Sequence, residues 1–387
     1  MSKFKIKTLN GISSNGLDRF GENYDVDSQM NNPDAIVLRS ASLHEMEFEP
    51  TLHSIARAGA GVNNIPIDRC TEQGIVVFNT PGANANAVKE LAVASLLLSS
   101  RKIIEGVNWV RTLQGNDISK DVEKGKSQFV GPEVRGKRLG VIGLGAIGVM
   151  VANAAVNMDM KVYGYDPYIS VEHAWGLSRA VKKADDLDKL FSKCDYVTLH
   201  IPLTDNTKGF INKESIEKMP KGVRIINLSR GGLVNNDDLI KALKAGQVST
   251  YVTDFPDAKL INVDGVIPIP HLGASTPESE DNCAIMAVLQ TKDFLENGNI
   301  KNSVNFPSCD LGIRMAKHRL TIAHRNIPKM LGQISGVLSE QGTNISNMIN
   351  RSYGDYAYTM VDLETEITDE NVDKIKNIVG VIRVRVL

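Results

Sequence analysis

The sequence has few cysteines and no long apolar run. Its four cysteines, in 387 residues, show no CxxC pair and no metal-ligand spacing. This pattern predicts reduced thiols in a cytoplasmic protein and no metal site. No stretch approaches the length of a membrane span, and the N-terminus lacks the apolar segment of a signal peptide.

An excess of one charge is also lacking. The formal net charge is −1, so no basic field indicates nucleic acid or a membrane surface as a partner. Hydrophobic residues make up 42% and charged residues 23%, as is ordinary for a globular protein. The length allows two or three domains.

A glycine-rich segment organises the rest of the sequence. Gly143, Gly145 and Gly148 follow an apolar run and precede a helix-compatible run, and a second apolar run ends at Asp166. Strand, turn, helix, strand and acid in this order are expected of a dinucleotide-binding βαβ unit. The flanking runs are residues 139–142, 149–158 and 161–165.

Each of these residues has a physical role in that interpretation. Gly143 permits the tight turn, Gly145 lets the backbone approach a pyrophosphate, and Gly148 lets the helix pack against the strand. The helix N-terminus offers N–H groups to the phosphates. Asp166 accepts from the ribose hydroxyls and repels a 2′-phosphate, which favours NAD over NADP. A purely structural turn is the alternative.

The first hundred residues alternate between strand and helix patterns, which predicts a parallel sheet. Arg39 and Ser40 follow the second strand, at the sheet edge where ligands bind. Arg39 either holds an anion or is a solvated surface residue. The predicted strands are residues 5–9, 35–38 and 74–78, with 52–58 as a helix running into a strand.

Two further segments offer candidate ligand contacts. Asn86 is expected to cap a helix over 87–99, and a ligand contact from the same helix start is compatible with capping. Residues 115–126 are polar and charged, which predicts an exposed loop. Lys126 in that loop either faces an acidic substrate or is only solvated.

Three polar segments follow apolar runs and carry the chemistry. Arg230, an acidic segment over 253–257 and His271 are expected at one sheet edge. A histidine takes the hydroxyl proton of a 2-hydroxy acid as hydride leaves, and an arginine holds the carboxylate. A nearby carboxylate would orient the imidazole. Each residue alone has a structural explanation, but together they favour hydride transfer. The strands are expected at 196–201, 224–228 and 250–253.

The remaining chain is expected to hold a helix, a linker and a separate unit. The helix spans 275–296 and the linker 298–310. The tail pattern is βαββαβ, which is ferredoxin-like. Its small core is compatible with pairing to a second copy, and the unit could be purely structural. Its strands are expected at 319–324, 344–348, 356–363 and 382–386, and its helices at 329–341 and 369–378.

The sequence resembles the D-isomer-specific 2-hydroxyacid dehydrogenase family over nearly its whole length. The resemblance implies an α/β fold, in which a Rossmann-type NAD-binding domain (98–275) is inserted into a smaller flavodoxin-like substrate-binding domain (1–97 and 276–308). A ferredoxin-like ACT regulatory domain (316–387) follows. The motifs that carry the resemblance are residues 39–40, 58–65, 79–88, 135–137, 228–232 and 270–276.

The resemblance also implies a reaction and its residues. NAD-dependent oxidation of 3-phospho-D-glycerate to 3-phosphooxypyruvate, the first step of L-serine synthesis, is expected of a homodimer or homotetramer. Arg230 matches the carboxylate-binding arginine and His271 the acid–base histidine. The implied substrate contacts are Arg39, Ser40, Gly59, Gly61, Asn86, Lys126 and Arg230. The implied cofactor contacts are Gly143, Gly145, Ala146, Ile147, Gly148, Asp166, Pro202, Leu228, Ser229, Asp254, His271, Gly273 and Ala274.

Two departures from the family pattern concern the active site. The family glutamate that pairs with the histidine would stand five residues after Asp254, where this chain has Lys259. We therefore predict Asp257 as the catalytic carboxylate beside His271. Ala146 stands where many members carry an arginine beside the pyrophosphate, which removes one charged contact.

Other functions stay open at this stage. In the tail, His324, Asn326 and Asn347 match the serine-binding positions of ACT domains, and an ACT unit that only assembles subunits is the alternative. The same fold could act on glyoxylate or hydroxypyruvate. A protein that only senses NADH would be expected to lose Arg230 or His271, and both are present.

Overall fold

The fold is built from three sheets in two compact units. The computed structural model describes residues 3–340 and 342–387. One unit comprises the chain up to Ala83 together with Pro277–Leu387, and the other comprises Asn84–Thr276. Within the described ranges, no helix combines the length and the apolar character needed to cross a membrane.

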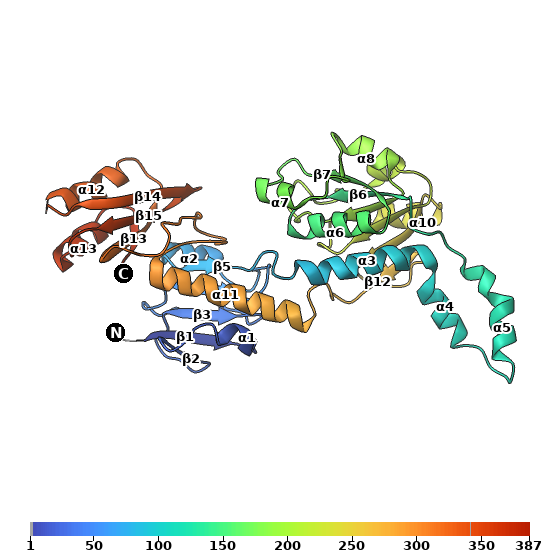
Figure 1. Ribbon diagram of the computed structural model, residues 1–387, viewed down its shortest axis with the longest axis horizontal. Helices are drawn as coiled ribbons and strands as arrows, with labels where there is room; N and C mark the ends of the chain where they lie inside the picture. Colours follow the sequence, from blue (N-terminus) through green and yellow to red (C-terminus); the bar gives the residue numbers. More distant parts are fainter. Residues whose placement is uncertain (1–2, 341) are drawn as a thin grey trace. The chain divides into compact units, whose positions relative to one another are not determined.

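The second unit is a seven-stranded parallel sheet with helices on both faces (Figure 1). Its strand order is β12-β11-β10-β9-β6-β7-β8, the doubly wound arrangement that the glycine-rich segment predicts. Its strands are β6 (Arg138–Ile142), β7 (Lys161–Tyr165), β8 (Lys182–Lys183), β9 (Tyr196–Leu199), β10 (Val223–Asn227), β11 (Val248–Thr253) and β12 (Val266–Pro268). Its helices are α3 (Ala85–Arg101), α4 (Ile103–Val110), α5 (Ile118–Gly125), η1 (Lys126–Phe129), α6 (Ala146–Asn157), α7 (Val171–Gly176), α8 (Leu187–Lys193), α9 (Lys213–Glu217) and α10 (Asn236–Lys244).

The strands of this sheet are apolar because both of their faces are buried. Val141 packs with α3 and α6 on one face, and its neighbour Ile142 packs with α8, α9 and α10 on the other. Ile225 and Ile226 divide between the two faces in the same way. Continuous apolar runs are therefore expected here, in place of polar alternation.

The N-terminal sheet of the first unit is also parallel, in the order β2-β1-β3-β4-β5. The long helix α11 packs on one face of it (Figure 1), and α2 and the segment around Leu43 pack on the other. Phe78 and Phe294 meet edge to face between sheet and helix, at 5.6 Å between ring centroids. The elements are β1 (Phe4–Leu9), α1 (Ser14–Leu17), β2 (Tyr24–Asp27), β3 (Ala35–Leu38), β4 (Ser54–Arg57), α2 (Ile67–Glu72), β5 (Val76–Phe78) and α11 (Pro277–Asn297).

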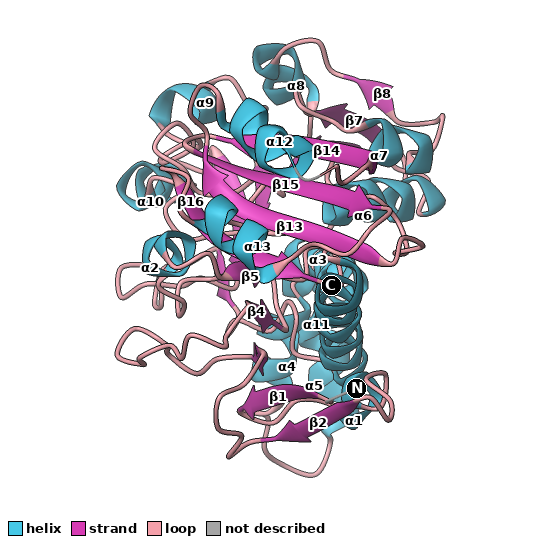
Figure 2. Cartoon of the chain, turned by 90° about the vertical axis from the view of Figure 1, so that its left-hand side faces the viewer, coloured by secondary structure: helices cyan, strands magenta, loops and turns pink. Residues whose placement is uncertain are grey.

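The C-terminal sheet is antiparallel in the order β14-β15-β13-β16, with α12 and α13 on one face (Figure 2). The predicted βαββαβ order is confirmed. Tyr358 and Met360 on the opposite face join the core that contains Phe294, so this sheet is packed on both sides. The elements are β13 (His318–Arg325), α12 (Met330–Glu340), β14 (Ile345–Tyr353), β15 (Tyr356–Leu363), α13 (Asp369–Lys376) and β16 (Val381–Val386).

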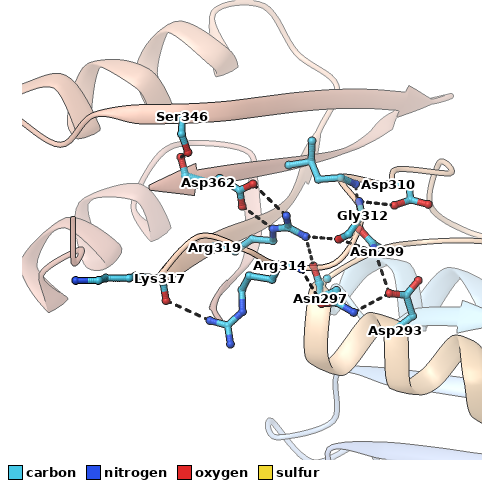
Figure 3. Close-up of polar contacts among 12 residues, drawn as sticks. Asp293, Asn297, Asn299, Asp310, Gly312, Arg314, Lys317, Arg319, Ser346 and Asp362 are labelled. Atoms are coloured by element: carbon cyan, nitrogen blue, oxygen red, sulfur yellow. Dashed lines mark hydrogen bonds and ion pairs between the residues drawn. The ribbon is translucent and has the colours of Figure 1, made fainter. Parts of the chain in front are cut away.

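Two arginines attach the C-terminal sheet to the end of α11, and Figure 3 shows the buried one, Arg319. Arg319, 1% exposed, donates from Nε and Nη2 to the two carboxylate oxygens of Asp362, at 2.6 and 3.0 Å. Its Nη1 donates to the carbonyl oxygens of Asn297 and Gly312, both at 2.9 Å. Because α11 has no basic residue in its own last turn, arginines from another sheet satisfy its negative end. Arg385 of β16 likewise donates to Phe294 and Leu295.

Several local predictions were wrong. Residues 52–58 were expected to hold a helix running into a strand, but they contain only the strand Ser54–Arg57. Residues 115–126 are mostly exposed, as predicted, but they contain the whole of α5 rather than a loop. Asn86 does not cap α3: the helix already begins at Ala85, and the Asn86 amide donates to Glu90 one turn later, at 2.9 Å.

The domain limits also differ from the predicted ones. The boundary between the two units falls after Ala83, so all of α3 belongs with the seven-stranded sheet. The sequence prediction divided this helix at residue 97. The cause is the packing of Val88, Ala92 and Leu96 against α6, which local sequence pattern does not report.

Arg319→Met should weaken the C-terminal attachment. It leaves the buried Asp362 carboxylate without its cation, a change that typically destabilises by about 3–5 kcal/mol. We expect the first urea-unfolding transition, followed by circular dichroism, to move to lower urea concentration. The exposed pair Lys374–Glu370 supplies the matched control, Lys374→Met, which should leave that transition in place. Equal behaviour of the two variants would contradict the assigned role of Arg319.

Candidate active site

The glycine-rich turn between β6 and α6 is shaped for close backbone approach. A Cβ on Gly148 would overlap the Gly143 carbonyl oxygen, and a Cβ on Gly143 would overlap the carbonyl of His200. Gly143 also has a backbone φ of +90°, which residues other than glycine rarely adopt. By contrast, no protein atom lies within 4 Å of a Cβ built on Gly145. The space beside Gly145 is therefore left free for a ligand.

The N-terminus of α6 and the acid after β7 suit a nucleotide. The N-cap Gly145 forms no side-chain cap, so the first-turn N–H groups of Ala146, Ile147 and Gly148 are left available to an anion such as a phosphate. Asp166, after β7, accepts from the backbone N–H of Leu144 and of Tyr168, each at 2.8 Å. These bonds fix the carboxylate and leave lone pairs for ribose hydroxyls. The residues present therefore fit a dinucleotide.

The chemical residues follow strand ends that lie level with one another. In register, Asn227 at the end of β10 pairs with Leu199 of β9 and with Thr253 of β11, and Thr253 pairs with Pro268 of β12. The segments that hold Arg230, Asp254 and His271 leave the sheet from this edge. The predicted convergence on one edge is thus present within this unit.

Phe255 lies against both the arginine and the histidine. Its ring centroid is 4.4 Å from that of His271 and 6.0 Å from Cζ of Arg230. The backbone that carries Arg230 is held by Asn227, whose amide donates to the Arg230 carbonyl oxygen at 2.9 Å. Both functional side chains are exposed. A base and a guanidinium are therefore presented to solvent around one aromatic ring.

The two aspartates of this edge have different surroundings. Asp257 is exposed, and its carboxylate accepts from Asn236 at 2.6 Å and from the backbone N–H of Lys259 at 2.9 Å. Asp254 is 2% exposed. Burial raises the pKa of the Asp254 carboxyl above its ordinary value, and the charge of His271 is the largest opposing influence.

The remaining predicted cofactor residues line the same strand ends. Ser229 donates to the Leu199 carbonyl oxygen at 2.6 Å, Leu228 is buried and Pro202 is exposed just after β9. Gly273 and Ala274 belong to the segment after β12, where Ser275 N–H donates to Leu272. Lys126, in η1, lies 2.5 Å from Glu123.

In the first unit, the predicted anion-binding arginine stands in a network of side chains. Arg39 lies 2.7 Å from Glu280 of α11. Arg57, at the end of the neighbouring strand β4, donates to the carbonyl oxygens of Arg39 and Gly61. Asn10 accepts from the backbone N–H of Ser40 at 2.9 Å. The Arg39–Ser40 segment and the Gly59–Gly61 turn are therefore joined through Arg57.

The predicted effector residues are unequally accessible. His324 is 2% exposed, with Nδ1 2.8 Å from the Arg325 carbonyl oxygen and Nε2 2.8 Å from Thr359 Oγ1. Burial lowers the pKa of the His324 imidazole. Asn326 and Asn347 are exposed, and the Asn326 amide donates to Gly354 at 3.2 Å.

Comparison with known proteins assigns the family. Residues 93–273 match the model of the D-isomer specific 2-hydroxyacid dehydrogenase, NAD binding domain. The chain is 32% identical to D-3-phosphoglycerate dehydrogenase of Haemophilus influenzae over 356 residues, which are 88% of this chain and 83% of that protein. The chain belongs to the D-isomer specific 2-hydroxyacid dehydrogenase family. Its NAD-binding domain carries the glycine turn and the Arg230–His271 edge, and its cofactor is NAD.

Other members of this family extend the comparison. D-3-phosphoglycerate dehydrogenase of Synechocystis is 36% identical over 315 residues, 78% of this chain and 54% of that protein. The chain spans about half the length of the first curated relatives that it matches. The NAD+-bound crystal structure of 3-phosphoglycerate dehydrogenase from Entamoeba histolytica superimposes with a TM-score of 0.59 at 28% identity, and covers 79% of this chain and 99% of that one.

Sequence reasoning missed three supporting residues of this candidate site. Arg57 and Asn227 each end a strand at the ligand edge, a position that could have marked them beside Arg39 and Ser229. Phe255 could not have been found in this way, because an aromatic residue between two aspartates does not predict the ring contact that it makes with His271.

A pair of glycine variants should separate folding from cofactor binding. In Gly148→Ala the new methyl meets backbone, so we expect a lower melting temperature together with weaker NADH binding. In Gly145→Ala the methyl enters empty space, so the melting temperature should hold while NADH affinity falls about tenfold, or about 1.4 kcal/mol. Thermal unfolding and NADH fluorescence titration measure both quantities. Unchanged NADH affinity in Gly145→Ala would contradict a pyrophosphate beside that turn.

Proposed function

We propose that the protein is a D-3-phosphoglycerate dehydrogenase, which interconverts 3-phospho-D-glycerate and 3-phosphooxypyruvate with NAD. The observation that carries the proposal is the exposed Arg230–His271 pair around Phe255 on an NAD-binding domain. The substrate is supported by relatives at 32–36% identity that bear this name. Serine synthesis and a cytoplasmic location belong to the same proposal.

The chain's own residues have distinct tasks in this reaction. Arg230 binds the substrate carboxylate through a two-pronged, charge-assisted contact. During oxidation, His271 accepts the hydroxyl proton from the oxygen on C2, while the C2–H bond breaks and its electron pair leaves as hydride. NAD, when bound, takes up that hydride. In the reverse direction, protonated His271 returns the proton to the carbonyl oxygen.

We assign the phosphate of the substrate to Arg39. Its position after β3, the bond from Arg57 to its carbonyl oxygen and its charge all support this role. The nearby Ser40, Gly59 and Gly61 supply backbone to the same contact. Asn86 and Lys126 remain predicted substrate contacts.

Arg39 should determine the preference for a phosphorylated substrate. For Arg39→Met we expect kcat/KM with 3-phosphooxypyruvate to fall about tenfold to a hundredfold, the range for a lost charged hydrogen bond. Turnover of unphosphorylated hydroxypyruvate should change little. The control variant Glu280→Gln removes the ion-pair partner of Arg39 but leaves the Arg39 charge in place. It should therefore retain the preference for the phosphorylated substrate. A wild-type enzyme that prefers glyoxylate or hydroxypyruvate would move the function to another 2-oxo acid.

We further propose that the C-terminal domain is an ACT domain that binds L-serine through His324, Asn326 and Asn347, in a homodimer or homotetramer. Two of the three side chains are exposed and polar, as recognition of an amino acid requires. The third, His324, is hydrogen-bonded to Thr359. Assembly of subunits without an effector is the competing role.

Serine should therefore lower the turnover of 3-phosphooxypyruvate in the wild type. In Asn347→Ala the exposed amide is lost, so we expect the L-serine concentration for half inhibition to rise about tenfold, equivalent to about 1.4 kcal/mol. The measurement is NADH oxidation during serine titration, with D-serine as the stereochemical control. Turnover indifferent to L-serine would leave the domain with an assembly role only.

A further inference from the structure

The strand-end segment after β11 holds a buried carboxylate that the proposed reaction has not yet used. Asp254 directly follows Thr253, and Thr253 Oγ1 accepts from the backbone N–H of Phe255 at 3.1 Å, which fixes the turn. Among the described residues, no well-aligned donor meets either carboxylate oxygen of Asp254, and the backbone N–H of Gly273 is close enough to act on the carboxyl group. An unpaired buried carboxylate is unfavourable unless a cation meets it at some stage.

The segment that carries His271 packs directly onto this carboxylate. A Cβ built on Gly273 would lie 3.2 Å from Asp254 Oδ2 and 3.4 Å from a methyl of Val88 on α3. Gly273 is thus a position where a missing side chain lets the backbone approach Asp254. His271 lies two residues earlier, with its ring against Phe255, the neighbour of Asp254.

The other candidate carboxylate, that of Asp257, already accepts hydrogen bonds from other residues. Asp257 accepts from Asn236 and from the backbone of Lys259, and it is exposed. The family glutamate is absent because Lys259 stands in its place, and the Lys259 ammonium lies 2.8 Å from Asp237. Asp254 is therefore the buried acid that packs against the His271 segment.

The geometry points to Asp254 as the positioning residue that stabilises protonated His271, in the role that the sequence assigned to Asp257. This inference rests on the proposed function, because it concerns the proton carrier of that reaction. The charged groups that act on the Asp254 carboxyl are His271 from the segment after β12 and Arg230 from the segment after β10. The substrate carboxylate compensates the positive charge of Arg230 when it is bound there. The imidazolium of His271 is then the cation that remains for Asp254.

The test compares Asp254→Asn with Asp257→Asn in the full-length protein. Removal of the Asp254 charge should shift the NMR titration midpoint of the His271 ring about one pH unit lower, the effect of losing a close opposite charge. Asp257→Asn should leave the midpoint in place. Reduction requires the protonated ring and slows as pH rises, so the falling limb of its pH–rate profile should move lower by the same amount in Asp254→Asn.

Three outcomes would overturn the assignment. They are a shift in Asp257→Asn alone, no shift in either variant, and a raised KM for NADH in Asp254→Asn with an unmoved titration, which would mark a cofactor contact only. Asp254→Ser is the second variant if the asparagine form does not fold. A wild type without turnover on any 2-oxo acid would reject the proposed function, while the NMR titration would still decide the role of Asp254.

Discussion

The level carboxyl ends of parallel strands are the constraint on which the candidate active site depends. Asn227, Thr253 and Pro268 are register partners on adjacent strands, so the segments that follow them start side by side. In a parallel sheet every strand runs in the same direction, and the residues beyond the strands collect at one edge. Arg230, Asp254 and His271 lie on three separate segments of the sequence, and they meet there without any local signal that joins them.

A second constraint acts at close range, where glycines let backbones touch. Gly148 packs on the Gly143 carbonyl, Gly143 packs on His200, and Gly273 packs on Asp254. The first two contacts fix the start of α6 and therefore the direction of its free N–H groups. The third brings the histidine segment against a buried acid. In each case the functional geometry follows from a missing side chain.

The sequence was sufficient wherever a pattern is local and repeated. The glycine turn, the acid at Asp166, the helix before the linker and the βαββαβ tail all follow from periodicity or spacing, and each element is present. It was insufficient where distant packing decides the outcome. The helix α3 extends beyond the predicted limits because its apolar side meets α6, and the partners of Asp257 lie in α10 and in the next turn, which no local pattern indicates.

The bonds between the C-terminal sheet and helix α11 link that sheet to the segment that follows His271. Helix α11 begins six residues after His271, and its last carbonyl groups accept from Arg319 and Arg385 of the C-terminal sheet. Partial separation of these groups would leave a buried charge unpaired, which is strongly destabilising. A change in the C-terminal sheet that moves Arg319 must therefore move the end of α11 or break these bonds. The same helix carries Glu280, the partner of Arg39, so its position bears directly on the proposed phosphate contact.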